Sequence, residues 1–317
     1  MAEILTMGEM IVEIMRDSAG CELKNAGVFR GPYPSGAPAI FIDTAARLGH
    51  SAAIIGGVGD DDFGSCLLER MKRDGVSTQF IEKGTLPTGC AFVTYFDDGS
   101  RKFIFHIGNS AAVEAHVPAA ECFAGVKVFH IMGCSLMADP AFGRKIVEAM
   151  KLAKAAGAIV SFDPNIRPEL MKDESAGELI RQVLDETDIF LPGVGELLAL
   201  TGCSDVREAV RICFEKPQMR VIAVKNGSKG CSVYKREEQL NVGIYEITPL
   251  DATGAGDCFD AAFVCALLDG CSLKEAAMRA SAAAAMNTAA FGPMEGDISE
   301  EKLCRFMKEG NPYVRIK

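Results

Sequence analysis

Short apolar runs alternate along most of the chain with longer segments in which apolar residues recur at helical spacing. Uninterrupted apolar runs are typical of strands buried on both faces of a sheet, and a spacing of three and four residues indicates helices with one face in a core. The predicted strands are Ile4–Met7, Ala52–Gly57, Val126–Ile131, Ala158–Phe162, Asp188–Leu191 and Arg220–Val224. The predicted helices are Ala37–Leu48, Phe63–Arg73, Pro140–Ala156, Glu174–Leu184, Gly254–Leu268, Leu273–Ala290 and Ser299–Glu309. This alternation predicts an α/β fold, a doubly wound and mainly parallel sheet with helices on both faces.

One region departs from the alternation. Cys90–Phe96 and Lys102–Ile107 are strand-like, and Asp97-Asp98-Gly99-Ser100 between them is typical of a hairpin turn. With Val28–Tyr33 they are predicted to form a small antiparallel β lid drawn from residues 10–34 and 86–112. An edge hairpin on the main sheet is the alternative. Since no linker or repeat divides residues 1–317, we expect one α/β domain that carries this lid.

Charge and composition narrow the range of partners. A formal net charge of −10 argues against binding to nucleic acid or to an anionic membrane, because such binding needs clustered Lys and Arg. We expect no secretory leader, because residues 1–8 carry no basic run, and no apolar stretch approaches the roughly 20 residues of a membrane-spanning helix. The 12 cysteines contain no CxxC pair. These features predict a cytoplasmic protein with neither nucleic acid nor membrane as a partner.

The segment DATGAGDCFDAAF, residues 251–263, has the most chemical content. Its glycines expose consecutive backbone N–H groups just before a predicted helix, and these groups together with the helix dipole suit a phosphoryl group. Asp257, in the first helical turn, is placed to accept a proton from a hydroxyl beside that group. The residues predicted to act in catalysis here are Gly254, Ala255, Gly256 and Asp257. The alternative is that the glycines only permit a tight turn and that Asp257 stabilises the helix end.

The same segment resembles the C-terminal signature of the ribokinase-like, or PfkB, carbohydrate kinases, DTTGAGDxFxAGF. Three further stretches are similar to that family's N-terminal half: SGAPA at 35–39, RLG at 47–49 and GVGDDDFG at 57–64. The resemblance implies an enzyme that transfers the γ-phosphoryl group of Mg-ATP to a primary hydroxyl of a small sugar. It also implies a lid over the sugar, ATP near the C-terminal half, Asp257 as the base, and a homodimer formed through the lid as one arrangement.

Further stretches match the nucleotide side of that family. Arg167 follows a predicted buried strand, so we expect it at the carboxyl edge of the sheet, where it can hold a phosphate or a carboxylate; a surface ion pair is the alternative. The resemblance places the KNGSKG stretch and a late helical amide beside ATP, with a plain β-turn and a locally bonded amide as the alternatives. The ATP-binding residues predicted in this way are Lys225, Gly227, Gly230 and Asn287, together with Gly254 and Gly256.

The resemblance also suggests metal positions. Glu196 matches the acidic end of an NxxE element that organises Mg²⁺, although an acid favoured by a helix N-terminus is the alternative. Asp251 and Thr253 match positions beside a monovalent cation, so activation by K⁺ is a hypothesis.

The acceptor site departs from the family pattern at three positions. Its predicted substrate-binding residues are Glu13, Ser35, Gly36, Ala37, Ile40, His106, Asn109 and Asp257. Ile40 stands where many relatives have an Asn that contacts sugar hydroxyls, Glu13 stands for an Asp, and Gly193 replaces the Asn of NxxE. These changes predict a ketohexose of the fructose or tagatose type, or a 2-keto-3-deoxy sugar acid, in place of ribose. The alternatives are a nucleoside kinase of the same fold and a non-catalytic sugar sensor, against which the intact Gly254–Asp257 run argues.

Overall fold

A ten-stranded sheet forms the centre of the molecule in the computed structural model, which describes residues 2–97, 100–171, 175–310 and 314–316. Its strands lie in the order β14-β13-β12-β11-β10-β9-β8-β1-β4-β5. From β5 to β11 neighbouring strands run parallel, and from β11 to β14 they run antiparallel. Their bounds are β1 Ile4–Met7, β4 Ala52–Val58, β5 Ile81–Lys83, β8 Val128–Met132, β9 Ile159–Asp163, β10 Ile189–Phe190, β11 Val221–Lys225, β12 Cys231–Tyr234, β13 Gln239–Val242 and β14 Val314–Ile316.

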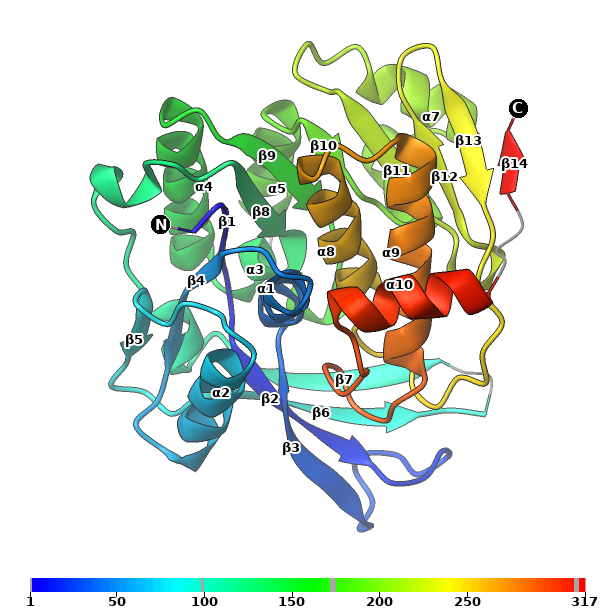
Figure 1. Cartoon of the computed structure of the whole chain (residues 1–317). Helices are drawn as coiled ribbons and strands as arrows, with labels where there is room; N and C mark the ends of the chain where they lie inside the picture. The colour runs from blue at the N-terminus through cyan, green and yellow to red at the C-terminus, as the bar shows by residue number, and fades with distance from the viewer. Residues whose placement is uncertain (1, 98–99, 172–174, 311–313, 317) are drawn as a thin grey trace.

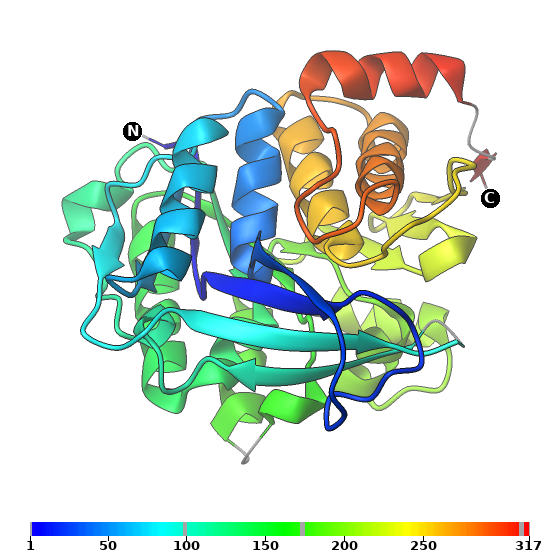
Figure 2. The same cartoon turned by 90° about the horizontal axis from the view of Figure 1, so that it is seen from below.

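Helices cover both faces of this sheet (Figures 1 and 2), which confirms the predicted fold class. On one face lie α1 (Ala37–Arg47), α8 (Ala255–Leu268) and α9 (Leu273–Thr288), and on the other lie α4 (Pro140–Ala155) and α5 (Ser175–Asp185). The other helices are α2 Asp62–Arg73, α3 Gly133–Ala138, α6 Val194–Thr201, α7 Val206–Cys213 and α10 Glu300–Glu309. Within the described ranges, no helix is both long and apolar enough to cross a lipid bilayer.

A second sheet lies below the carboxyl ends of the parallel strands in Figure 1. Its order is β3-β2-β6-β7, with bounds β2 Ile11–Arg16, β3 Phe29–Ser35, β6 Gly89–Tyr95 and β7 Arg101–His106. The outer pairs β2–β3 and β6–β7 are antiparallel as predicted, and the central pair β2–β6 runs parallel. Because this sheet is separate from the main one, the edge-hairpin alternative is wrong. The predicted turn at Asp98 and Gly99 lies outside the described residues.

The order of the strands reverses at β1, which pairs with β4 on one side and with β8 on the other. In open α/β sheets, ligands bind outside the carboxyl ends of the strands at such a reversal. The small sheet begins directly after β1 and faces this same edge, so the fold brings the two sheets together around one site.

Candidate active site

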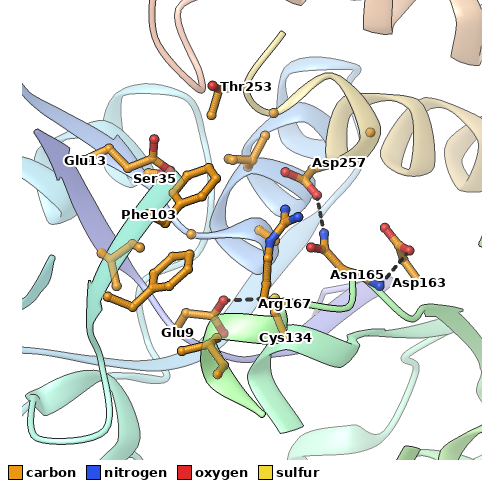
Figure 3. Close-up of a pocket in the computed structure, with 18 of the residues that line it drawn as sticks. Glu9, Glu13, Ser35, Phe103, Cys134, Asp163, Asn165, Arg167, Thr253 and Asp257 are labelled. Carbon is orange, nitrogen blue, oxygen red and sulfur yellow. Dashed lines mark hydrogen bonds between the residues drawn. The ribbon is translucent and has the colours of Figure 1, made fainter. Parts of the chain in front are cut away.

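A cavity of about 220 Å³ lies between the carboxyl edge of the main sheet and the small sheet. The small sheet and the start of α1 form one wall, and the loops after β8, β9 and β10 together with the N-terminus of α8 form the other (Figure 3). The lining residues are Glu9, Ile11, Glu13, Ser35, Gly36, Ala37, Ile40, Arg101, Phe103, Phe105, Ile107, Cys134, Asp163, Asn165, Arg167, Leu170, Gly193, Glu196, Lys225, Ala252, Thr253, Gly254, Gly256 and Asp257.

The turn before α8 has the geometry expected of an anion site. Gly254 caps the helix with φ +78°, and a Cβ there would lie 2.2 Å from the carbonyl oxygen of Pro293. Only glycine satisfies both the left-handed backbone and this close approach. Ala255 begins α8, so it and Gly256 have N–H groups in the first helical turn, where no carbonyl within the helix accepts them, and the Ala255 N–H donates over a long 3.4 Å to Ala252 O in the preceding turn.

Asp257 lies in that first turn and is only 6% exposed. Its Oδ1 accepts a hydrogen bond from Asn165 Nδ2 over 3.0 Å. Burial and, to a smaller extent, the neighbouring Asp163 raise the pKa of Asp257 to about 7, although Arg167 acts in the opposite direction. A carboxyl whose pKa lies near neutrality can accept a proton and release it again at the working pH.

Asn165 is oriented by an unusual backbone conformation. Its φ is +37°, a left-handed value that Asn tolerates better than most residues. Its backbone N–H donates to Asp163 Oδ1 over 3.1 Å, while its side chain reaches Asp257 (Figure 3). Asn165 Oδ1 is buried and has no hydrogen-bond partner within the described part of the chain. Strained residues with unpaired polar atoms are concentrated at ligand sites.

Lys225, at the end of β11, is held between two acids. Its Nζ lies 2.8 Å from Asp163 Oδ2 and 2.9 Å from Asp260 Oδ2, and Asp260, one turn after Asp257, is 0% exposed. Although burial acts in the opposite direction, Lys225 holds the pKa of Asp163 below its usual value, and burial raises that of Asp260. Nζ also lies 3.8 Å from the position of a Cβ on Gly256, so a fixed positive charge sits beside the anion turn.

Arg167 and Glu196 line the same wall of the cavity as Asp257. No described residue forms an ion pair with Arg167, and its guanidinium lies between Phe103 and Asn165 in Figure 3. The surface ion pair considered from the sequence is therefore absent among these residues. Glu196 accepts hydrogen bonds from Ile166 N and Gly193 N, both over 2.7 Å, and burial raises its pKa. Glu196 lies in the first turn of α6, which agrees with the alternative that a helix N-terminus favours an acid there. Glu196 also lines the cavity.

Two further buried acids line the cavity: Glu13 lies on the wall formed by the small sheet, and Glu9 follows β1. Glu13, in β2, is 6% exposed, its Oε1 accepts from Ser35 Oγ over 2.7 Å, and burial raises its pKa to about 7. Its Oε2 has no hydrogen-bond partner among the described residues. Glu9 accepts hydrogen bonds from Cys134 Sγ and Ser135 Oγ, and burial raises its pKa as well. A hydroxylated ligand would supply donors to this wall.

The structure brings most of the predicted acceptor residues to this wall: Glu13, Ser35, Gly36, Ala37 and Ile40 all line the cavity. It does not bring His106 or Asn109 there. Successive residues of a strand point to opposite faces, so Phe103 and Phe105 of β7 face the cavity while His106 faces outward, edge-on against Phe92. Asn109 is exposed and lines a separate hollow. The prediction that His106 and Asn109 bind substrate is therefore wrong, because their side chains are not part of this site.

Among the remaining predicted residues, Thr253 lines the cavity, whereas Asn287, Gly227, Gly230 and Asp251 do not. Asn287 is buried, and its Nδ2 donates to the carbonyl oxygens of Thr253 and Pro293, which agrees with the locally bonded alternative and gives it a role in holding the turn. Gly227 and Gly230 form a short 3-10 turn after β11 and do not line the cavity. Asp251 and Thr253 bond to each other and to residues of the small sheet.

Sequence reasoning did not assign five of the polar lining residues: Glu9, Arg101, Cys134, Asp163 and Asn165. Position alone could have identified four of them, because Glu9 follows β1, Cys134 follows β8, and Asp163 and Asn165 end or follow β9. Arg101 had no such signal, since its place depends on how the small sheet folds back over the main one.

Comparison with known proteins agrees with this geometry. The sequence matches the pfkB family of carbohydrate kinases over residues 1–300. It is 33% identical to fructokinase-1 of Oryza sativa subsp. japonica, covering 96% of this chain and 97% of that protein, and 34% identical to fructokinase-2 of Solanum lycopersicum, covering 86% and 84%. A provisionally named ribokinase II from E. coli, solved in complex with ATP and Mg²⁺, superposes with a TM-score of 0.89 at 37% identity, covering 98% of this chain and 100% of that one.

The chain therefore belongs to the pfkB family of carbohydrate kinases. It is an ATP-dependent sugar kinase, and the cavity between its two sheets is the candidate active site.

Proposed function

We propose that this kinase transfers the γ-phosphoryl group of Mg-ATP to a primary hydroxyl of a ketohexose, with fructose as the first candidate. One observation carries the proposal: Asp257 and the Gly254–Gly256 turn lie on one wall of a cavity whose other wall holds Glu13 and Ser35. A base and an anion site thus face residues able to bind hydroxyls. The fructokinases of rice and tomato, each at least 33% identical, support fructose.

Proton transfer is assigned to Asp257. The sugar hydroxyl loses its proton to the Asp257 carboxylate as its oxygen bonds to the γ-phosphorus, and the bond from that phosphorus to the leaving ADP oxygen breaks. Asn165 Nδ2 holds the carboxyl in place, and burial keeps its pKa high enough for it to take the proton. The N–H groups of the Gly254–Gly256 turn and the Arg167 guanidinium stabilise charge on the phosphoryl oxygens.

The residues present fit Mg²⁺. This ion prefers oxygen ligands and usually takes one or two carboxylates together with substrate phosphates. Glu196 and Asp163 supply carboxylate oxygens to the cavity, and Asn165 Oδ1 is a buried oxygen with no described partner. These residues would hold the ion or its water shell. When bound, Mg²⁺ neutralises charge on the β- and γ-phosphates. Gly193 supplies no side-chain ligand, so we expect the family's amide contact to be missing here.

The acceptor wall departs from the contacts expected of a ribose site, so it suits another neutral sugar. Ile40 removes a hydrogen-bonding position, while Glu13 extends its acceptor over one more methylene than Asp. A second candidate is a 2-keto-3-deoxy sugar acid, and one observation favours it: Arg167 lines the cavity without an ion-paired described partner, so it is available for a carboxylate. Which of the two classes reacts is a question for the substrate panel below.

We also propose that the small sheet, within residues 10–34 and 86–112, acts as a lid that excludes water from the sugar. Phe103 and Phe105 support this role, because they stack 5.2 Å apart on the cavity side. On the outer side, Ile104 is 43% exposed, and there we propose that a second copy of the chain packs in a homodimer.

The first experiment is ADP release from purified protein with Mg-ATP and fructose, tagatose, 2-keto-3-deoxygluconate, ribose and adenosine as separate acceptors. We expect one keto-sugar to be turned over well above ribose and adenosine. For that sugar, Asp257→Asn should lower kcat by about 10²–10⁴-fold. Calorimetry should show that the variant still binds the sugar. Turnover that survives this substitution unchanged would remove Asp257 as the base.

A further inference from the structure

The small sheet touches the phosphoryl-binding turn through two side chains that the proposed reaction does not use. Tyr95 and Arg101 lie directly opposite each other on β6 and β7. Cross-strand partners share a face, and Arg101 lines the cavity, so both side chains extend from the inner face of the lid. The Tyr95 hydroxyl donates to Asp251 Oδ2 over 3.1 Å, and Arg101 Nη1 donates to Thr253 Oγ1 over 2.9 Å.

These contacts reach the anion turn through a single peptide bond. Thr253 directly precedes Gly254, and its carbonyl oxygen is held from the other side by Asn287 Nδ2 over 2.8 Å. The Thr253 hydroxyl also donates to Asp251 Oδ1 over 2.7 Å. Thr253 is therefore fixed by the lid in front and by α9 behind. Any movement of the lid strands must act on the backbone that supplies the first amides of the anion site.

The residues expected to hold a monovalent cation do not fit that role. Each carboxylate oxygen of Asp251 already accepts two protein hydrogen bonds, which leaves no free lone-pair site: Oδ1 accepts from Thr253 N and Oγ1, and Oδ2 accepts from Tyr95 and from Gly292 N. Burial raises the pKa of Tyr95, so its hydroxyl stays protonated and donates. The Thr253 hydroxyl accepts from a guanidinium, which would repel a second cation at this distance.

We propose that Tyr95 and Arg101 form a latch between the lid and the Asp251–Thr253 segment, and that Arg101 supplies there the positive charge expected of a monovalent cation. Both are positioning residues: they fix the Gly254–Gly256 turn for phosphoryl transfer and link the closed lid to an ordered anion site. The inference rests on the proposed function for its kinetic consequences. It means that the enzyme works without K⁺.

The kinetic test compares Arg101→Gln and Arg101→Lys with Lys102→Gln, a matched control that removes a lid charge on the exposed outer face. Rates with the best acceptor are measured in K⁺ and in tetramethylammonium at equal ionic strength. The wild type and Lys102→Gln should give the same kcat in both salts. Arg101→Gln should lose about tenfold or more in kcat, with a smaller change in the KM for the sugar, and should regain part of it in K⁺. Arg101→Lys should keep most of the rate in both salts.

A wild-type rate that collapses in tetramethylammonium would overturn the assignment of the charge to Arg101. So would an Arg101→Gln variant whose kcat matches the wild type in both salts.

A second measurement tests the latch without turnover, so that it stands apart from the proposed reaction. Hydrogen–deuterium exchange of the amides at residues 253–257 should be faster in Arg101→Gln and in Tyr95→Phe than in the wild type, and unchanged in Lys102→Gln. If the panel finds no acceptor, the proposed function fails while this result still decides the latch. Equal exchange in all four proteins would refute it.

Discussion

Asp257 combines two properties at the scale of a single residue: it is buried and it must ionise to act. Burial, with Asp163 nearby, raises its pKa to about 7, and the base works only when deprotonated. We therefore expect kcat/KM to rise about tenfold per pH unit on the acid side and to level off above the pKa. A pH profile of kcat/KM under saturating Mg-ATP measures this. A profile that is flat from pH 5 to about pH 8 would contradict a base with this pKa.

The same shift makes a prediction about stability. The pKa in the folded protein lies above that of an unfolded Asp, so folding favours the protonated form. The stabilising contribution is present below about pH 4 and is lost as pH rises through about 7. Asp257→Asn stays neutral, so it should unfold at a higher temperature than the wild type at pH 8, by the equivalent of up to about 4 kcal/mol. The difference should shrink toward pH 5 in thermal melts, whereas a gap that widens there would reverse the sign.

At the scale of elements, the turn into α8 depends on Gly254, and the same Gly→Ala substitution at Gly270 provides a matched control. Gly254 and Gly270 lie before and after α8 with φ of +78° and +75°. A Cβ on Gly254 would lie 2.2 Å from the carbonyl oxygen of Pro293, while one on Gly270 would meet nothing within 4 Å. Gly270→Ala should cost about 1 kcal/mol of unfolding free energy from backbone strain alone.

Gly254→Ala adds the backbone clash to the same strain. Gly254→Ala should lower the free energy of unfolding, measured by urea denaturation, clearly more than Gly270→Ala does. It should also lower kcat, because the anion-site amides are displaced. Equal losses in the two variants would mean that the Pro293 contact relaxes without effect.

The sequence predicts elements whose signal is local. The parallel strands are continuous apolar runs, and β4 is buried at all seven positions, so its burial on both faces could be deduced from composition. β2 carries Glu13 within an apolar run, and its pairing with β6 requires a contact between distant segments, which no local pattern shows. β12 and β13 likewise form an antiparallel edge that the expected strand–helix alternation does not contain.

The site divides in the same way. Asp257 and its turn were predicted because a short motif carries them. The side of the lid on which a residue lies could not be predicted, as His106 shows. The register of a strand decides which of two neighbouring side chains points inward, and a shift of one residue exchanges them. Arg101 depends on the same register, which is why it emerged only from the folded lid.

At the scale of the whole molecule, exposed apolar residues are concentrated on the lid. In the described ranges the large apolar residues with substantial exposure are Val28, Phe29, Leu86, Ile104, Met171, Ile244 and Leu250. The first four belong to the two segments assigned to the lid. Water-exposed apolar groups that gather on one surface mark an interface more often than single residues scattered over a protein do.

If a second copy covers the outer face of the lid, one charge placed there should separate the two chains. Ile104, on the outer face of β7, and Ile244, outside the lid segments, are 43% and 45% exposed, so they form a matched pair. We expect light scattering coupled to size exclusion to give a dimer mass for the wild type and for Ile244→Asp, and a monomer mass for Ile104→Asp, because a buried unpaired carboxylate is costly. A wild type that stays monomeric across micromolar concentrations would contradict the dimer, and the lid would then act within one chain.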